Sequence, residues 1–284
     1  MKPYFKTASG DFTLYKGDCR EVVPQLPGSS FDTVFADPPY FLSNGGFTVQ
    51  SGKMVSVNKG TWDRTAGQAE NTNFNYQWIR ACREKMSDSA TIWVCGTFHN
   101  IYSVATALSS LDFRILNAVT WQKTNPPPNL SCRFFTHSTE VLLWARKCKK
   151  VPHYFNYDLM HQLAGDRQMT DVWRLPAIGR WEKTCGKHPT QKPLALIVRA
   201  LLASTKLNGS ILDPFAGSST TGIAANLICR GFVGIESNEE FLELSKQRRL
   251  VYESESDTWK QRIPDLVQLR ENGKGKERTM QENR

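Results

Sequence analysis

The sequence predicts an α/β fold in which helices cover both faces of a doubly wound, mostly parallel sheet. Two observations carry this prediction. Short apolar segments rich in β-branched and aromatic residues recur along the chain, and segments with helical periodicity lie between them. With 284 residues, 40% of them hydrophobic, the chain can bury the core that such a sheet needs, which excludes global disorder. No run approaches eighteen apolar residues, so no membrane-spanning helix is expected.

Seven segments are expected to form strands and three to form helices. The strands, in chain order, cover residues 12–15, 32–36, 91–95, 115–121, 141–144, 210–212 and 231–235. Apolar residues three and four positions apart predict one helix through Phe74 and Cys82 and a second just after Pro193. A third helix opens at Phe241, and its far face carries Lys and Arg.

Residues 1–270 are predicted to form one domain, followed by a charged, flexible tail at residues 271–284. Residues 41–68 are rich in Gly, Ser and Asn and are expected to form a long loop. The segment from residue 114 to residue 200 holds 14 Lys and Arg against 5 Asp and Glu, so it carries the whole net charge of +9. Charge concentrated in this way favours a bound polyanion over a merely solubilising surface.

The cysteines favour neither disulfides nor structural zinc. Seven are present, an odd number, and they are scattered with no C-x-x-C pair. No metal-ligand set with plausible spacing is found. The N-terminal residues lack the apolar region of a signal peptide, so the expected location is a reducing cytoplasm.

The first motif that carries chemistry is Asp37, Pro38, Pro39 and Tyr40, directly after the strand that ends at Ala36. Ligands of parallel sheets bind at such strand ends. The Asp37 carboxylate and the Pro38 carbonyl both accept hydrogen bonds and therefore suit an exocyclic amine with two N–H donors, while Tyr40 offers a ring for stacking. In isolation the motif would favour a rigid turn with a capping Asp, but Tyr40 and the second motif favour a site.

The second motif covers residues 211–222, which predict a strand, a turn of small residues and a helix start. Gly217 allows a ligand to approach the backbone, and roughly twenty residues later a strand ends at Glu236, which can accept both hydroxyls of a ribose. By itself this pattern fits any Rossmann-like nucleotide site. No Walker lysine follows, which excludes a phosphate-cleaving P-loop.

Two further positions are weaker signals. Residues 187–193 form a rigid polar turn before a helix, where a helix N-terminus and Lys192 suit a carboxylate, although an ordinary helix start would look alike. Asp18 follows the first strand and Gly17, and a plain turn aspartate explains it equally well.

Together these motifs resemble the S-adenosylmethionine-dependent amino-methyltransferases of DNA. D-P-P-Y is the catalytic motif of that family, D-P-F-x-G-S-x-T-T-G its cofactor motif, and H-P-T-Q-K-P a further cofactor motif, here in the permuted β order. The resemblance covers about residues 12 to 250. It is closest to adenine methyltransferases of restriction-modification systems that modify GATC or GANTC, in particular the second methyltransferase of Dpn-type GATC systems. The segments that carry this closer match are residues 40–46, 99–102, 123–126, 129–133 and 136–140.

The resemblance implies a Rossmann-like methyltransferase sheet with an inserted basic target-recognition region at residues 124–187. It implies S-adenosylmethionine as cofactor, DNA as partner, and three sets of site residues. The catalytic residues would be Asp37, Pro38, Pro39 and Tyr40. The cofactor would contact Asp18, His188, Thr190, Gln191, Lys192, Asp213, Pro214, Phe215, Ala216, Gly217, Ser218, Thr220, Thr221, Glu236 and Ser237. DNA would contact Asn44, Lys123, Asn129, Arg133, Arg146, Tyr154 and Arg174.

The expected activity is methylation of the N6 amine of adenine, in GATC, protecting host DNA from a cognate restriction enzyme. Single-stranded DNA is an expected second substrate, since an unpaired base costs less to flip out. Alternatives that stay open are a GANTC-specific adenine enzyme, a cytosine-N4 enzyme, a methyltransferase of RNA or of a protein amide, a non-catalytic DNA-binding homologue, and a homodimer. One departure from the family is Ser219, where Gly is common.

Overall fold

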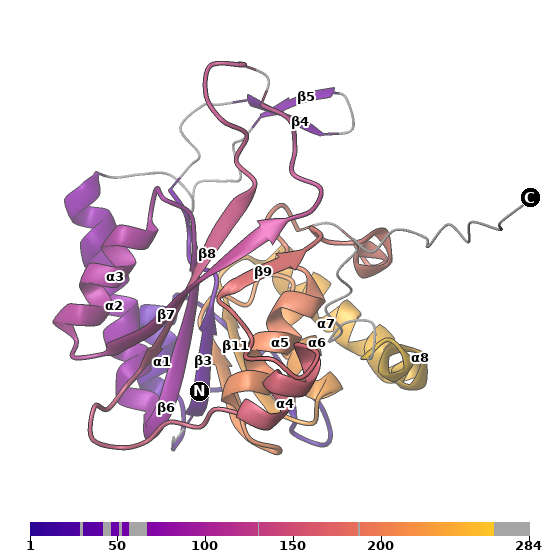
Figure 1. Ribbon diagram of the computed structural model, residues 1–284. Helices are drawn as coiled ribbons and strands as arrows, with labels where there is room; N and C mark the ends of the chain where they lie inside the picture. Colours follow the sequence, from indigo (N-terminus) through magenta and orange to yellow (C-terminus); the bar gives the residue numbers. More distant parts are fainter. Residues whose placement is uncertain are drawn as a thin grey trace, which may run out of the picture.

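The computed structural model describes residues 1–28, 31–41, 47–50, 53–56, 67–129, 131–186 and 188–263 (Figure 1). Its centre is a nine-stranded sheet with the order β1-β2-β11-β10-β3-β6-β8-β7-β9. These strands are β1 (Phe5–Lys6), β2 (Phe12–Lys16), β3 (Phe31–Ala36), β6 (Met86–Gly96), β7 (Arg114–Lys123), β8 (Thr139–Arg146), β9 (Val172–Leu175), β10 (Ser210–Asp213) and β11 (Gly231–Glu236).

The sheet is mostly parallel, as predicted. Strands β2, β11, β10, β3 and β6 run parallel to one another, and so do β7 and β9. Strand β8 lies antiparallel between β6 and β7, and β1 pairs antiparallel with β2. The five central strands therefore end at one edge of the sheet, which is the edge where ligands of such folds bind.

Helices cover both faces of the sheet, and a separate apolar core lies under each face (Figure 1). On one face lie α1 (Cys19–Gln25), α2 (Gln68–Lys85) and α3 (Ile101–Ser110), and on the other α5 (Leu194–Ser204), α6 (Thr220–Leu227) and α7 (Glu239–Ser254). Two shorter helices are α4 (Tyr157–Leu163) and α8 (Ser256–Gln261), and residues Arg180–Lys183 form a 3-10 turn. Both strand faces are buried, which explains why the strands read as continuous apolar runs rather than as alternating ones.

Every predicted strand is present, but the predicted loop at residues 41–68 was partly wrong. It contains a small antiparallel sheet of β4 (Phe47–Gln50) and β5 (Lys53–Ser56), outside the main sheet. The sequence also missed the edge strands β1 and β9, because two to four residues carry too little periodicity to be recognised. The predicted tail at residues 271–284 and the DNA-binding candidate Asn44 lie outside the described residues.

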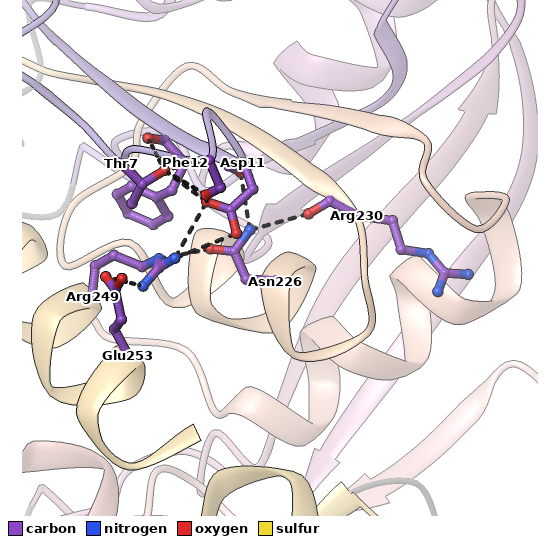
Figure 2. Close-up of polar contacts among 8 residues, drawn as sticks. Thr7, Asp11, Phe12, Asn226, Arg230, Arg249 and Glu253 are labelled. Carbon is purple, nitrogen blue, oxygen red and sulfur yellow. Dashed lines mark hydrogen bonds and ion pairs between the residues drawn. The ribbon is translucent and has the colours of Figure 1, made fainter. Parts of the chain in front are cut away.

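A partly buried polar network joins the turn between β1 and β2 to helices α6 and α7 (Figure 2). The Arg249 guanidinium lies 3.3 Å from both oxygens of Asp11 and donates to the side-chain oxygen of Asn226 at 2.9 Å. The Asn226 amide in turn donates to the backbone carbonyl of Asp11 at 3.0 Å. Arg249 is buried, as is Arg248, so the expectation of a basic outer face on this helix was wrong at these two positions. Both arginines instead fix α7 against the half of the sheet that carries the second motif.

Candidate active site

The carboxyl ends of β2, β3, β10 and β11 open onto one cavity of about 290 Å³. All the residues predicted for catalysis and for cofactor binding line it, although they come from segments more than two hundred residues apart. They are Asp18, Asp37, Pro38, Pro39, Tyr40, His188, Thr190, Gln191, Lys192, Asp213, Pro214, Phe215, Ala216, Gly217, Ser218, Thr220, Thr221, Glu236 and Ser237. The fold thus brings the three motifs together, as the parallel strand order requires.

The motif predicted to be catalytic lies in a compact group of charges. The Lys192 ammonium lies 2.7 and 2.6 Å from the two oxygens of Asp37, and the Tyr40 hydroxyl donates to Asp37 at 2.9 Å. Glu140, on β8, accepts from the Tyr40 hydroxyl at 3.1 Å and pairs with Lys123 at 2.6 Å and with Lys192 at 3.7 Å. We call these five residues the catalytic corner. Its two lysines balance its two carboxylates, so the group is neutral although largely buried.

The protonation states in this corner follow from burial and from the neighbouring charges. Burial opposes the charge of Lys192, but the Asp37 and Glu140 carboxylates outweigh it and raise the Lys192 pKa. Burial opposes the charge of Glu140 too, but Lys192 and Lys123 hold its pKa below the usual range. Burial and the two carboxylates raise the pKa of Tyr40, which therefore stays a hydrogen-bond donor.

A tight turn connects β10 to α6 and forms the floor of the cavity. Gly217, at φ +51°, packs so closely on His188 that a Cβ there would lie 3.0 Å from the imidazole Nε2. Its backbone N–H donates to Glu236 at 2.9 Å, and its carbonyl accepts from the Ser245 hydroxyl at 2.6 Å. Arg248 donates to the carbonyl and hydroxyl of Ser218. Side chains of helix α7 therefore fix the turn by hydrogen bonds to its backbone. The helical periodicity of the sequence could not reveal these hydrogen bonds.

Three carboxylates line the cavity near this turn. Burial raises the pKa of Asp213 to about 7, and its oxygen accepts the backbone N–H of Phe215 at 2.9 Å. Burial also raises the pKa of Glu236, whose second oxygen accepts from Asn238 at 2.8 Å. Asp18 caps α1, and hydrogen bonds from Arg20 lower its pKa. Asp18 thus both caps a helix and lines the cavity. Its interpretation as a turn aspartate is therefore compatible with its interpretation as a cofactor contact.

Ser219, the departure from the family pattern, occupies a backbone conformation that glycine adopts more easily. It caps α6 with φ 54° and ψ 40°, in the left-handed region. It is fully buried, and its hydroxyl has no hydrogen-bond partner among the described residues. The preference for Gly at this position therefore has a local physical cause.

Several apolar cavity residues were not predicted from the sequence. Phe74 on α2, Ile197 on α5 and Phe241 on α7 line the cavity together with Phe35 and Ile235. Phe74 contacts Phe215, with ring centroids 6.1 Å apart, and so joins the second motif to a helix far away in the chain. The apolar patterns of the sequence show that these residues are buried. They do not show whether a buried residue packs in the core or lines the cavity.

The predicted DNA-binding residues do not form one group. Arg146 pairs in register with Thr91, at the end of the sheet opposite the cavity. Tyr154 lies near Lys206, beyond the carboxyl end of α5, about 16 Å along that helix from the catalytic corner. Lys123 contacts Glu140 within the catalytic corner. Of the remaining described candidates, Arg133 and Arg174 are exposed and Asn129 is half-buried.

Within the described ranges, no cluster of His, Cys, Asp and Glu could hold a metal ion. No described helix is long and apolar enough to cross a membrane.

Comparison with known proteins agrees with this geometry. Residues 31–247 match the family model described as DNA methylase, which covers N6 and N4 enzymes. The chain is 54% identical over 248 residues to the Type II methyltransferase M2.MboI of Moraxella bovis, covering 87% of this chain and 91% of the relative. It is 49% identical over 258 residues to the Type II methyltransferase M2.DpnII of Streptococcus pneumoniae, covering 90% and 94%.

A solved structure gives the same result at the level of the fold. The crystal structure of the complex of M1.HpyAVI with S-adenosylmethionine has a TM-score of 0.65 at 26% identity, covering 84% of this chain and 98% of that chain. The family match and these relatives span most of the chain, including all three motifs. The chain therefore belongs to the N6/N4 DNA methylase family and is an S-adenosylmethionine-dependent DNA methyltransferase.

Proposed function

We propose that this enzyme methylates the N6 amine of adenine in GATC, and that it accepts single-stranded as well as duplex DNA. The observation that carries the chemistry is the position of Asp37, which faces the same cavity as the glycine turn at Gly217 and the carboxylate of Glu236. An amine acceptor and a nucleoside-binding turn within one cavity suit direct methyl transfer to an exocyclic amine.

The chemistry of the residues that line the cavity suits S-adenosylmethionine. Gly217 lets its turn lie directly against the imidazole of His188, where a Cβ would come within 3.0 Å of the ring, and both residues line the cavity. The ribose hydroxyls would be held by Glu236, the cationic methionine moiety would face the carboxylate of Asp213, and aromatic rings such as Phe74 and Phe215 would cover the adenine. When bound, this cofactor supplies an electrophilic methyl group.

Asp37 would orient the target amine. Lys192 and Tyr40 already contact its oxygens, but a carboxylate has about four acceptor positions, so it can also accept an N–H from adenine. Together with the Pro38 carbonyl it would hold both amine hydrogens and favour the positive charge that develops on the nitrogen. Lys192 would hold the carboxylate in place, so we move this residue from the predicted cofactor set to the catalytic corner.

Support for adenine and for GATC comes from the resemblance. In the family, Asp at the first position of the catalytic motif mostly accompanies adenine, and Ser accompanies cytosine. The closer match of the sequence is to the second methyltransferase of Dpn-type GATC systems, and M2.DpnII is among the relatives. Protection of host DNA against a cognate restriction enzyme would follow from that activity.

The test uses two oligonucleotides, one containing GATC and one containing GAATC flanked so as to exclude GATC. Each is offered single- and double-stranded at fixed salt, because phosphate contacts make apparent specificity depend on salt. Mass spectrometry of the product nucleosides should show N6-methyladenine from both forms of the GATC strand. Methylation of GAATC alone would contradict the sequence assignment, N4-methylcytosine would contradict the base, and activity confined to duplex would contradict only the single-strand proposal.

A variant tests the role of Asp37 directly. Asp37→Ala should abolish single-turnover methylation while S-adenosylmethionine affinity, measured by calorimetry, stays within about threefold of wild type, since that change is under 1 kcal/mol. A near wild-type rate would remove Asp37 from the reaction.

A further inference from the structure

A cluster of exposed aromatic rings lies next to the catalytic corner and is used by none of the roles assigned above. Phe135 is 95% exposed, Phe134 57% and Phe98 52%. The Phe98 ring lies 5.4 Å from that of His137, which lies 5.3 Å from Phe134, and the His99 ring lies 3.8 Å from Phe98. We call these five residues the aromatic rim. Single exposed aromatics are common on protein surfaces, but a contiguous group from two separate segments marks an interaction surface.

The two segments that form the rim also contact the catalytic motif. Two residues after Phe98, the buried Asn100 donates to the Pro39 carbonyl at 3.4 Å. Three residues after His137, Glu140 accepts from the Tyr40 hydroxyl at 3.1 Å. Two or three residues of chain span at most about 7–11 Å, so the rim borders the place where a target amine would meet Asp37.

The surroundings of the rim identify its partner. Its larger segment is the connection between β7 and β8, which projects beyond the edge of the sheet where β3 ends (Figure 1). The exposed Arg133 directly precedes Phe134, within the segment that carries the net positive charge of the chain. An exposed arginine beside exposed rings suits a nucleic acid strand, whose phosphates can pair with the guanidinium and whose bases can stack on the rings.

Flipping the target adenine explains why rings are needed at this place. The extruded base leaves its neighbours without a stacking partner, which costs a few kcal/mol in a duplex. Aromatic side chains next to the catalytic pocket can replace the lost stacking. Burial and the neighbouring His137 lower the pKa of His99, so that ring is neutral at physiological pH and suited to stacking.

We propose that Phe98, Phe134 and Phe135 stack on the DNA bases adjoining the flipped adenine, and so hold the strand while the target base occupies the cavity. The proposal rests on the proposed function, because it requires a flipped nucleotide. It adds a base-stacking surface that motif analysis did not select, since only Arg133 and Asn129 were predicted in this segment.

The test compares a Phe134→Ala/Phe135→Ala double variant and a Phe98→Ala variant with wild type. A matched control is Tyr157→Ala, which removes a ring that is 47% exposed, on α4 near the carboxyl end of α5 and away from the cavity. Affinity for oligonucleotides is measured by fluorescence anisotropy, and flipping by the fluorescence of 2-aminopurine at the target position. Neither readout requires turnover.

Each lost ring should weaken DNA binding about tenfold, the size of one base–aromatic stack, and should reduce the 2-aminopurine signal. S-adenosylmethionine affinity and the thermal midpoint should not change, and Tyr157→Ala should bind DNA as wild type does. A Phe134→Tyr/Phe135→Tyr variant, which keeps both rings, should retain affinity.

DNA affinity and flipping within twofold of wild type in the alanine variants would overturn the proposal. A change in oligomeric state with unchanged DNA binding would also overturn it, and would assign the rim to contacts between copies of the chain. Wild-type protein that binds and flips DNA through the rim but methylates no adenine would instead count against the proposed function, so the two failures are distinguishable.

Discussion

Replacing Ser219 by glycine should stabilise the protein. The residue combines two unfavourable features, a left-handed backbone at φ 54° and a fully buried hydroxyl with no hydrogen-bond partner among the described residues. A side chain in that backbone region costs about 1–2 kcal/mol, and an unsatisfied buried hydroxyl costs about 1–3 kcal/mol. Glycine offsets roughly 0.4–1 kcal/mol of this gain, because the unfolded chain has more conformational freedom with glycine than with serine. The net expectation is a gain of about 1–4.5 kcal/mol, or roughly 2–8 °C in the thermal midpoint at this chain length.

Differential scanning calorimetry of two further variants separates the contributions. Ser219→Ala removes the hydroxyl but keeps the strained backbone, so it should recover only part of the gain. Ser218→Gly is the matched control: its hydroxyl accepts a hydrogen bond from Arg248 at 2.9 Å, and its loss should destabilise by about 1.5–3 kcal/mol. If Ser219→Gly melted at or below the wild-type temperature, the strain argument would be refuted. The comparison would show that the turn gains stability from Ser219 in a way that its backbone angles do not reveal.

Three further predictions concern carboxylates of the cavity and of the catalytic corner. Glu236→Ala should weaken S-adenosylmethionine binding by roughly 1–3 kcal/mol, the size of a charged hydrogen bond, and unchanged calorimetric affinity would remove Glu236 from the site. Burial raises the pKa of Asp213 to about 7, so the folded state keeps a proton that the unfolded chain, with a pKa of about 3.9, releases. The contribution of Asp213 to the free energy of unfolding is therefore full below pH 4 and is lost as the pH rises to 7. Urea titrations should show that the free energy of unfolding changes less between pH 5 and pH 8 for Asp213→Asn than for wild type. An equal change in the two proteins would contradict this. Glu140→Gln leaves Lys123 and Lys192 with one carboxylate between them. This should lower the free energy of unfolding, measured by urea titration, by roughly 3 kcal/mol. A change too small to measure would show that the ion pairs of Glu140 are not effectively buried.

Local signals were enough to predict seven of the strands, the helices α2, α5, α6 and α7, and the motif residues that line the cavity. A buried parallel strand needs a continuous apolar run, so the segments ending at Ala36, Leu212 and Ile235 were recognisable from a few residues each. Pro38 and Gly217 mark turns through their own backbone restrictions. Since parallel strands end at one edge, locating the strand ends also located the site.

Long-range partners could not be predicted, because the same residue type serves several environments. Lys192 was predicted to contact the cofactor and Lys123 to contact DNA, yet both pair with carboxylates beside Tyr40. Arg248 and Arg249 were expected on an outer face and are buried against polar partners. A charged residue in a sequence does not show whether water or a distant side chain will solvate it.

By itself the sequence determined the alternation of strands and helices, the three motifs and their meeting at one edge of the sheet, because period, turn chemistry and strand direction are properties of short segments. Only the tertiary structure decided the order of the strands, the antiparallel position of β8, and the neutral group formed by Asp37, Lys192, Glu140 and Lys123. It also decided that Phe98 meets His137 across two connections. These features depend on which distant surfaces pack together, and burial then fixes the charge that each group can carry.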